Sequence, residues 1–97
     1  RHFMGGLYTD GTKYLADKAG AYWLLDAIFA WQTDANVSKE SFQVWSLRVN
    51  DDKSALLTGD DGNGNEIASQ AIPFTDFPLS EIQLYFTDRT VLLPGEY

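Results

Sequence analysis

The stretch AYWLLDAIFAW, residues 21–31, decides the fold because nine of its eleven residues are plainly apolar. A helix that is apolar on nearly every side must be covered on nearly every side. Its eleven residues are too few to span a bilayer, which needs about 20. We therefore expect the central helix of a small domain, with the later parts of the chain folded over it.

Upstream of this helix, residues 13–19 predict a shorter helical segment, capped by a Thr or Asp among residues 9–12. Gly20 then either ends this segment or bends it into the central helix. Residues 3–8 have apolar side chains around a glycine pair, which predicts a short edge strand bent at the two glycines.

After residue 42 the spacing of apolar residues changes from the helical period to a period of two, which is typical of strands. Trp45 and Leu47 fall on one face of the first strand, and Phe42 and Val44 fall on the other. The sequence DDGNGN at 60–65 is the strongest turn signal, since Asn-Gly and Asp-Gly accept the positive φ of tight hairpins. The other strands are expected over residues 54–58, 66–72, 82–87 and 91–93.

Helices followed by a run of hairpins predict an α+β fold, in which an N-terminal helix or helix pair packs on one face of a four- to five-stranded antiparallel meander sheet. The expected core joins the inner sheet face to the central helix through Trp45, Leu47, Ile82, Leu84, Phe86, Leu24, Ile28 and Trp31. A meander also places the strand-end acids at two ends of the sheet, with Asp51, Asp52 and Asp76 at one end and Asp60, Asp61, Glu66 and Asp88 at the other.

Length and composition bound the class of protein. Ninety-seven residues support one α+β domain, 1–97, and the start at Arg1 predicts that a short N-terminal segment is missing. Because the chain has no cysteine, disulfides, thiolate nucleophiles and cysteine zinc sites are excluded. A small chain without disulfides or a signal-like segment is expected in the cytoplasm, with no membrane partner.

Fourteen acids against seven bases give a net charge of −7. Such a surface is repelled by phosphates, so we expect no direct binding to nucleic acid. Two interpretations of the charge stay open: it keeps the chain soluble, or it faces a partner protein with a basic surface.

Residues for catalysis or for a metal form no recognisable pattern. His2 is the only histidine, with no cysteine or second histidine to share a metal, and no serine lies in a Gly-x-Ser-x-Gly motif. The DDGNGN turn begins like a calcium-binding EF-hand loop, but Glu66 replaces the required glycine and Ile72 replaces the bidentate glutamate. We therefore expect no enzyme, no cofactor and no metal site.

Surplus aromatic residues and acids are the candidates for binding. Three Trp, five Tyr and six Phe exceed the obvious needs of one small core, although a core rich in large side chains is the alternative explanation. Asp26 within the apolar helix either marks a solvent-facing stripe or is a buried functional carboxylate. The candidate partner- or ligand-binding residues are Tyr14, Trp23, Asp26, Phe42, Tyr85, Asp60 and Asp61.

Five stretches cover well over half of the chain and carry a resemblance. They are LYTDGTKYLADKAGAYWLLD (7–26), FQVW (42–45), DDGNGN (60–65), IPFTDFPL (72–79) and LLPGEY (92–97). The chain resembles a family of small bacterial proteins, also met on plasmids and phages, that is known only as a domain of unknown function. The resemblance implies no activity, cofactor or catalytic residue; the mobile elements favour a role in conflict between element and host.

The first hypothesis is a non-enzymatic acidic module that binds an unidentified protein partner, such as an inhibitor or accessory protein of a host defence system. The alternative is a small-ligand-binding domain with a pocket between helix and sheet, lined by Tyr14, Trp23 and Tyr85. A homodimer, in which a second copy completes the burial of the apolar helix, is a third hypothesis.

Overall fold

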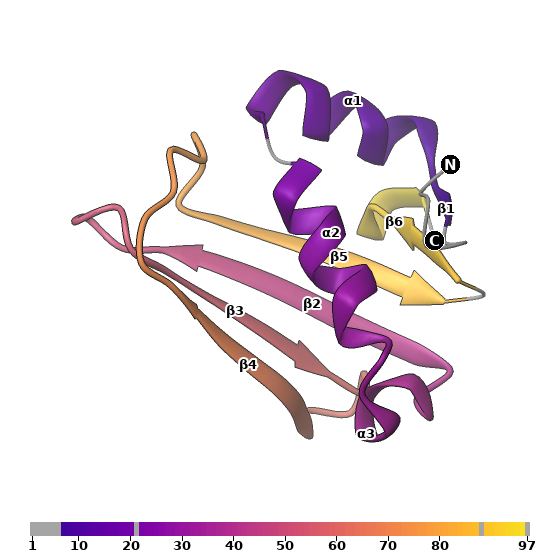
Figure 1. The fold of residues 1–97 in the computed structure, drawn as a ribbon. Helices are drawn as coiled ribbons and strands as arrows, with labels where there is room; N and C mark the ends of the chain where they lie inside the picture. The colour runs from indigo at the N-terminus through magenta and orange to yellow at the C-terminus, as the bar shows by residue number, and fades with distance from the viewer. Residues whose placement is uncertain (1–6, 21, 88, 97) are drawn as a thin grey trace.

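The protein folds as helices on one face of an antiparallel sheet, and the expected α+β class is confirmed (Figure 1). The computed structural model describes residues 7–20, 22–87 and 89–96. The helices are α1 Asp10–Ala19, α2 Tyr22–Trp31 and α3 Ala35–Ser38, with a short 3-10 turn η1 at Pro94–Glu96. The strands are β1 Leu7–Tyr8, β2 Phe42–Val49, β3 Ala55–Asp60, β4 Glu66–Ile72, β5 Glu81–Thr87 and β6 Thr90–Leu92.

The strand order differs from a simple meander at two places, the position of β1 beside β6 and the position of β5 beside β2. Within the described residues the sheet has the order β1-β6-β5-β2-β3-β4, so β5 pairs with β2 rather than with the preceding strand β4. The connection between β4 and β5, residues 73–80, passes the β2–β3 turn and contacts it there. Thr75 N donates a hydrogen bond to Lys53 O over 2.8 Å, and Phe77 of the connection is buried. The chain therefore returns on the far side of β2.

The N-terminal elements follow the expected pattern, with a break at Gly20. Thr9 Oγ1 accepts a hydrogen bond from Thr12 N over 3.2 Å and caps α1. Gly20 ends α1 in the left-handed conformation, with φ of 62°, so the chain forms two helices in series. β1 is an edge strand that pairs with β6 in parallel; the rest of the strand expected over residues 3–8, like Ala21, lies outside the described residues.

The core lies between α2 and the inner face of the sheet, as expected. Leu24, Ile28, Trp45, Leu47, Leu84 and Phe86 are buried, and Ile82 and Trp31 are half-buried. The Phe29 and Phe86 rings meet edge to face with centroids 5.9 Å apart. Within a single chain, Leu24, Leu25, Ile28 and Phe29 of α2 are buried, and Trp23 and Trp31 are half-buried. None of the helices in the described ranges is long and apolar enough to cross a membrane.

A buried polar residue joins α3 to the sheet. Gln43 is fully buried, and its Nε2 lies 3.0 Å from Val37 O and 3.1 Å from Glu40 O. Its Oε1 accepts a hydrogen bond from Trp45 Nε1 over 2.9 Å. Helix α3 itself was not expected in the polar segment after α2; Asp34 caps it, and Val37 anchors it in the core.

Candidate functional site

The sheet face away from the helices carries Phe42, Val44 and Tyr85, as the alternation in β2 and β5 predicts. The residues between them in the strands, such as Trp45 and Leu84, are buried against the helices. The rings of Phe42 and Tyr85 meet edge to face, with centroids 5.1 Å apart and an angle of 69° between their planes. Two strands thus combine their aromatic residues into one contact on the open face.

Two acids adjoin this aromatic pair at the end of β3. Val44 of β2 is paired with Tyr85 of the neighbouring strand β5 and with Asp60 of the neighbouring strand β3. Because residues paired across strands point to the same side of a sheet, all three side chains share the open face. Asp61 follows directly in the turn. We name these residues the aromatic–acidic patch: Phe42, Val44, Asp60, Asp61 and Tyr85.

The turn after Asp60 is held in place by its own side chains and by contact with Phe42. Asp60 Oδ1 accepts a hydrogen bond from Gly62 N over 2.7 Å. Gly62 has φ of 86°, and a Cβ atom there would lie 2.9 Å from Phe42 Cδ2, so glycine allows the turn to pack on the ring. The acids therefore have a defined position beside the aromatic pair.

Asp61 is the most strongly hydrogen-bonded acid of the patch. Its Oδ2 accepts from Asn65 Nδ2 over 3.0 Å, and its Oδ1 accepts from Asn63 N over 2.8 Å. These donors stabilise the charged carboxylate and lower the pKa of Asp61, the Asn65 side chain contributing most. The patch therefore carries negative charge at neutral pH.

The opposite end of the open face has a different character. Arg48 and Glu81 form an exposed ion pair over 3.1 Å. They border a shallow hollow of about 220 Å³, whose other lining residues are Ser46, Leu56, Thr58 and Gln83. The positive charge of Arg48 is thus paired with Glu81 at this end of the face, whereas acids adjoin the aromatic pair at the other end.

The other predicted site residues lie on the helical side of the molecule. Tyr14 on α1 is 65% exposed, with Lys18 Nζ 5.6 Å from its ring centroid. Trp23 on α2 is half-buried against the core, and Asp26 is exposed on the same helix. Asp26 therefore belongs to the solvent-facing stripe and is not a buried carboxylate.

The expected pocket lined by Tyr14, Trp23 and Tyr85 is not formed by these residues. Tyr85 faces away from the helices, because its strand neighbours Leu84 and Phe86 point toward them. The prediction was wrong because it combined residues from both faces of one sheet layer.

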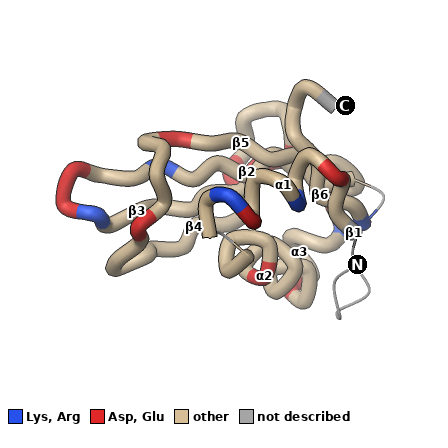
Figure 2. Tube along the Cα trace, turned by 90° about the horizontal axis from the view of Figure 1, so that it is seen from above, with Lys and Arg blue, Asp and Glu red and all other residues tan. Residues whose placement is uncertain are grey.

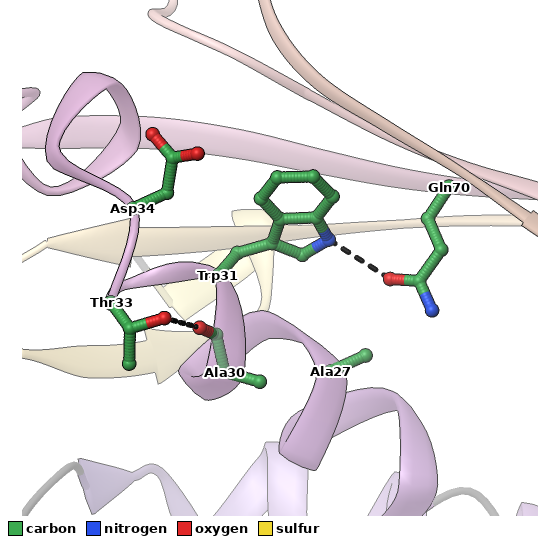
Figure 3. A pocket seen from close by; sticks show the side chains of 6 residues that line it. All are labelled: Ala27, Ala30, Trp31, Thr33, Asp34 and Gln70. Atoms are coloured by element: carbon green, nitrogen blue, oxygen red, sulfur yellow. Dashed lines mark hydrogen bonds between the residues drawn. The ribbon is translucent and has the colours of Figure 1, made fainter.

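A second hollow, of about 290 Å³, lies between α2 and β4 (Figure 3). Trp31 Nε1 donates to Gln70 Oε1 over 2.9 Å and closes one side of it. The other lining residues are Ala27, Ala30, Thr33 and Asp34. The sequence placed Trp31 in the expected core and among the surplus aromatic residues, but it did not predict this hollow; the small residues Ala27 and Ala30, about one turn apart, were the available signal.

Acids are spread over the fold rather than gathered on one surface (Figure 2). Asp51 lies in the β2–β3 turn, while Asp60 and Glu66 lie at the opposite end of these strands. Asp88, expected near the second group, lies outside the described residues. In the ranges that the structure describes, no three His, Cys, Asp or Glu residues are grouped so that they could hold a metal ion.

Residues 1–97 match the family described as "Family of unknown function (DUF6876)". No curated protein and no solved structure gives a significant match.

Proposed function

This chain belongs to DUF6876, a family of unknown function, and we propose from its own surface that it is a non-enzymatic module that binds a partner protein with a basic surface. The aromatic–acidic patch is the contact site in this proposal. The observation that carries it is that the Phe42 and Tyr85 rings share the open sheet face with Asp60, and that the turn that holds Asp60 and Asp61 approaches the Phe42 ring at Gly62.

The chemistry of the patch favours an arginine or lysine from the partner. A guanidinium or ammonium group is attracted to the face of an aromatic ring, and this contact contributes roughly 0.5–2 kcal/mol depending on burial. A carboxylate beside the ring can accept charge-assisted hydrogen bonds from the same group. Aromatic residues are also enriched at the centres of protein interfaces.

The charge of the whole chain supports the same kind of partner. A net charge of −7 attracts a basic surface at long range and raises the rate of encounter. Because these charges act through solvent, binding should weaken as salt is added.

We expect the partner to be a factor of a host defence system, which the chain would inhibit or assist. This part of the proposal rests on our expectation that relatives of this chain occur on plasmids and phages, and not on the geometry of the patch.

Capture from a host lysate at low and high salt, with matched variants as bait, tests the proposal. Asp60→Asn with Asp61→Asn removes two charges from the patch and keeps an oxygen acceptor for the turn amides of Gly62 and Asn63. A specific partner should be retained by wild type and lost, or at least about tenfold weakened, with this variant.

The control makes the same change of charge at the opposite end of the sheet. Asp51→Asn with Asp76→Asn alters two exposed acids and should retain the partner. Equal loss of binding with both pairs would indicate a nonspecific charge effect, and recovery of no protein that depends on the patch would refute the proposed site.

A further inference from the structure

Asn63 lies in the turn between β3 and β4, and it is the only asparagine of the chain that a glycine follows. The other three, Asn36, Asn50 and Asn65, precede Val, Asp and Glu. The side-chain amide of an asparagine can react with the backbone nitrogen of the next residue, and a Cβ atom on that residue hinders the approach. Gly64 has no such atom, so the sequence makes Asn63 the most reactive of the four asparagines.

The structure leaves both reacting groups at this position free. Asn63 and Gly64 are exposed. Among the residues that the structure describes, none forms a hydrogen bond with the side chain of Asn63 or with the backbone N–H of Gly64. A Cβ atom built at Gly64 would have nothing within 4 Å of it, so the space around this nitrogen is open. The carboxamide of Asn63 is therefore able to rotate onto Gly64 N.

Two of the other asparagines have side chains that are already held. Asn65 Nδ2 donates to Asp61 Oδ2 over 3.0 Å. Asn50 Nδ2 donates to Ser54 Oγ over 3.0 Å. Each of these carboxamides must break its hydrogen bond before it can react, so the structure adds to the difference that the sequence sets.

The same turn contains another pair of residues whose sequence permits this ring closure, Asp61 followed by Gly62, but both of its groups are engaged. Gly62 N donates to Asp60 Oδ1 over 2.7 Å. Both carboxylate oxygens of Asp61 accept hydrogen bonds. The structure thus separates two neighbouring sites that the sequence alone does not separate.

We propose that Asn63 is a site of spontaneous deamidation, with water as the only co-reactant. Gly64 N forms a bond with Cγ of Asn63, the bond between Cγ and Nδ2 breaks, and Nδ2 leaves as ammonia with the proton that Gly64 N has lost. The product is a succinimide ring. Water then breaks one of the two bonds from Gly64 N to the ring carbonyl carbons: cleavage at Cγ gives aspartate, and cleavage at the backbone carbonyl carbon gives isoaspartate.

Either product changes the turn that holds the acids of the patch. Both add one negative charge next to Asp61, and isoaspartate also adds one carbon atom to the main chain. Asp61 N donates to Asn65 O over 3.2 Å, and Asp61 Oδ1 accepts from Asn65 N over 3.3 Å. These two bonds close the turn around residue 63, so a longer main chain there should break them.

The consequence for binding rests on the proposed function, whereas the conversion itself needs no partner. The isoaspartate form should bind the partner more weakly, because Asp60 and Asp61 then lose their fixed position beside Phe42. A failure of the binding proposal would leave the conversion of Asn63 measurable on the isolated chain.

The experiment incubates the purified whole chain at neutral pH and physiological temperature and follows it by peptide mass spectrometry. Residue 63 should gain the mass difference between an amide and an acid, and enzymatic methylation should detect isoaspartate there. The internal standards are Asn36, Asn50 and Asn65, and Asn63 should convert at least about tenfold faster than any of them. Conversion of Asn63 at the same rate as the others overturns the proposal.

Two variants test the mechanism. Gly64→Ala places a Cβ atom beside the attacking nitrogen and should slow the conversion at least about tenfold. Because alanine is strained at the φ of 88° that Gly64 adopts, Asn63→Gln is the second variant; it keeps the amide but needs a larger ring, so it should convert at least as slowly.

Gly95→Ala is the matched control, since its Cβ atom also enters open space, and it should leave the rate at Asn63 unchanged. Conversion of Gly64→Ala at the wild-type rate overturns the mechanism. Isoaspartate that forms at Asp61 as fast as at residue 63 would show that the hydrogen bonds of the turn do not select the site, and it would overturn the structural part of the proposal.

Discussion

Gln32 and Gln43 exchange side-chain hydrogen bonds across the interior of the molecule. Nε2 of Gln32 donates to Oε1 of Gln43 over 2.8 Å, and Nε2 of Gln43 donates to Oε1 of Gln32 over 2.9 Å. Gln32 lies just after α2 and also donates to Ile28 O over 3.1 Å. The pair therefore fixes the end of the central helix against the first long strand.

Replacing Gln43 with leucine should destabilise the fold by about 2–4 kcal/mol, because it leaves the buried indole N–H of Trp45 and the carbonyl of Val37 without this partner. Urea unfolding measures the loss. Gln83→Leu, at an exposed position of β5, is the control and should change stability by under about 0.5 kcal/mol. A loss below about 1 kcal/mol for the Gln43 variant would show that the interior adapts to an apolar residue.

Gly59 is required by the packing of Trp45. A Cβ atom at Gly59 would lie 2.9 Å from two ring atoms of Trp45, which is itself buried between the sheet and the helices. Gly59→Ala should therefore lower the midpoint of thermal unfolding, with a cost of about 1–3 kcal/mol for overpacking.

Gly95→Ala is the matched control, since a Cβ atom at Gly95 would have nothing within 4 Å of it, and this variant should be close to neutral. Equal melting temperatures for the two variants would show that the Trp45 ring shifts without cost.

Sequence periodicity was sufficient to assign the two faces of the sheet. Trp45 and Phe42 fall on opposite faces because successive side chains of a strand alternate, whatever the neighbouring strands are. The position of Asp60 within the patch also follows from its hairpin, since the DDGNGN turn fixes where β3 ends. Three of the seven candidate residues thus come together on the open face, namely Phe42, Asp60 and Tyr85, and a fourth, Asp61, follows in the adjoining turn.

Periodicity does not determine which strands are neighbours. The alternation of side chains in β5 would be the same beside β2 as beside β4. The observed order comes with a hydrogen bond between Thr75 in the 73–80 loop and Lys53 in the β2–β3 turn, which the alternation does not predict. The burial of Gln43 was equally hard to predict. A glutamine side chain can face the core only where other elements supply hydrogen-bond partners for its amide, as Gln32 does here. The error over the expected pocket has the same origin, because alternation along a strand carries no information on the distance between a strand residue and a helix residue.

Tyr22 should ionise at a higher pH than an ordinary tyrosine because of its contact with Asp17. Tyr22 Oη donates to Asp17 Oδ1 over 2.6 Å, and this bond raises the pKa of Tyr22 from 10.0 to about 12. Ultraviolet titration of the phenolate should therefore show one tyrosine that ionises near pH 12, and Tyr22→Phe should remove it. Because the folded pKa is the higher one, this contribution to stability is present below pH 10 and is lost as the pH rises toward 12.

Asp17→Ala removes the acceptor of this hydrogen bond together with the charge. It should return the pKa of Tyr22 toward 10.0, because the hydrogen bond to Asp17 is the main cause of the shift. A titration in which the tyrosine with the raised pKa remains after Asp17→Ala would assign it to a different residue.

The turn that supports the patch should become less stable in acid, because hydrogen bonds lower the pKa of Asp61 below 3.8 in the folded state. A lowered folded pKa means that the carboxylate stabilises the fold above about pH 4, and that this contribution disappears as the pH falls through the folded pKa. The stability difference between wild type and Asp61→Asn should therefore shrink from neutral pH to about pH 2. Asp51→Asn, in the β2–β3 turn at the other end of these strands, is the control. It makes the same change of net charge, so it measures how net charge alone affects the stability at each pH. If the difference between wild type and Asp61→Asn stayed constant over this range, the hydrogen bonds from Asn63 and Asn65 would not favour the ionised carboxylate, and the turn would owe its position to its glycines and its contact with Phe42.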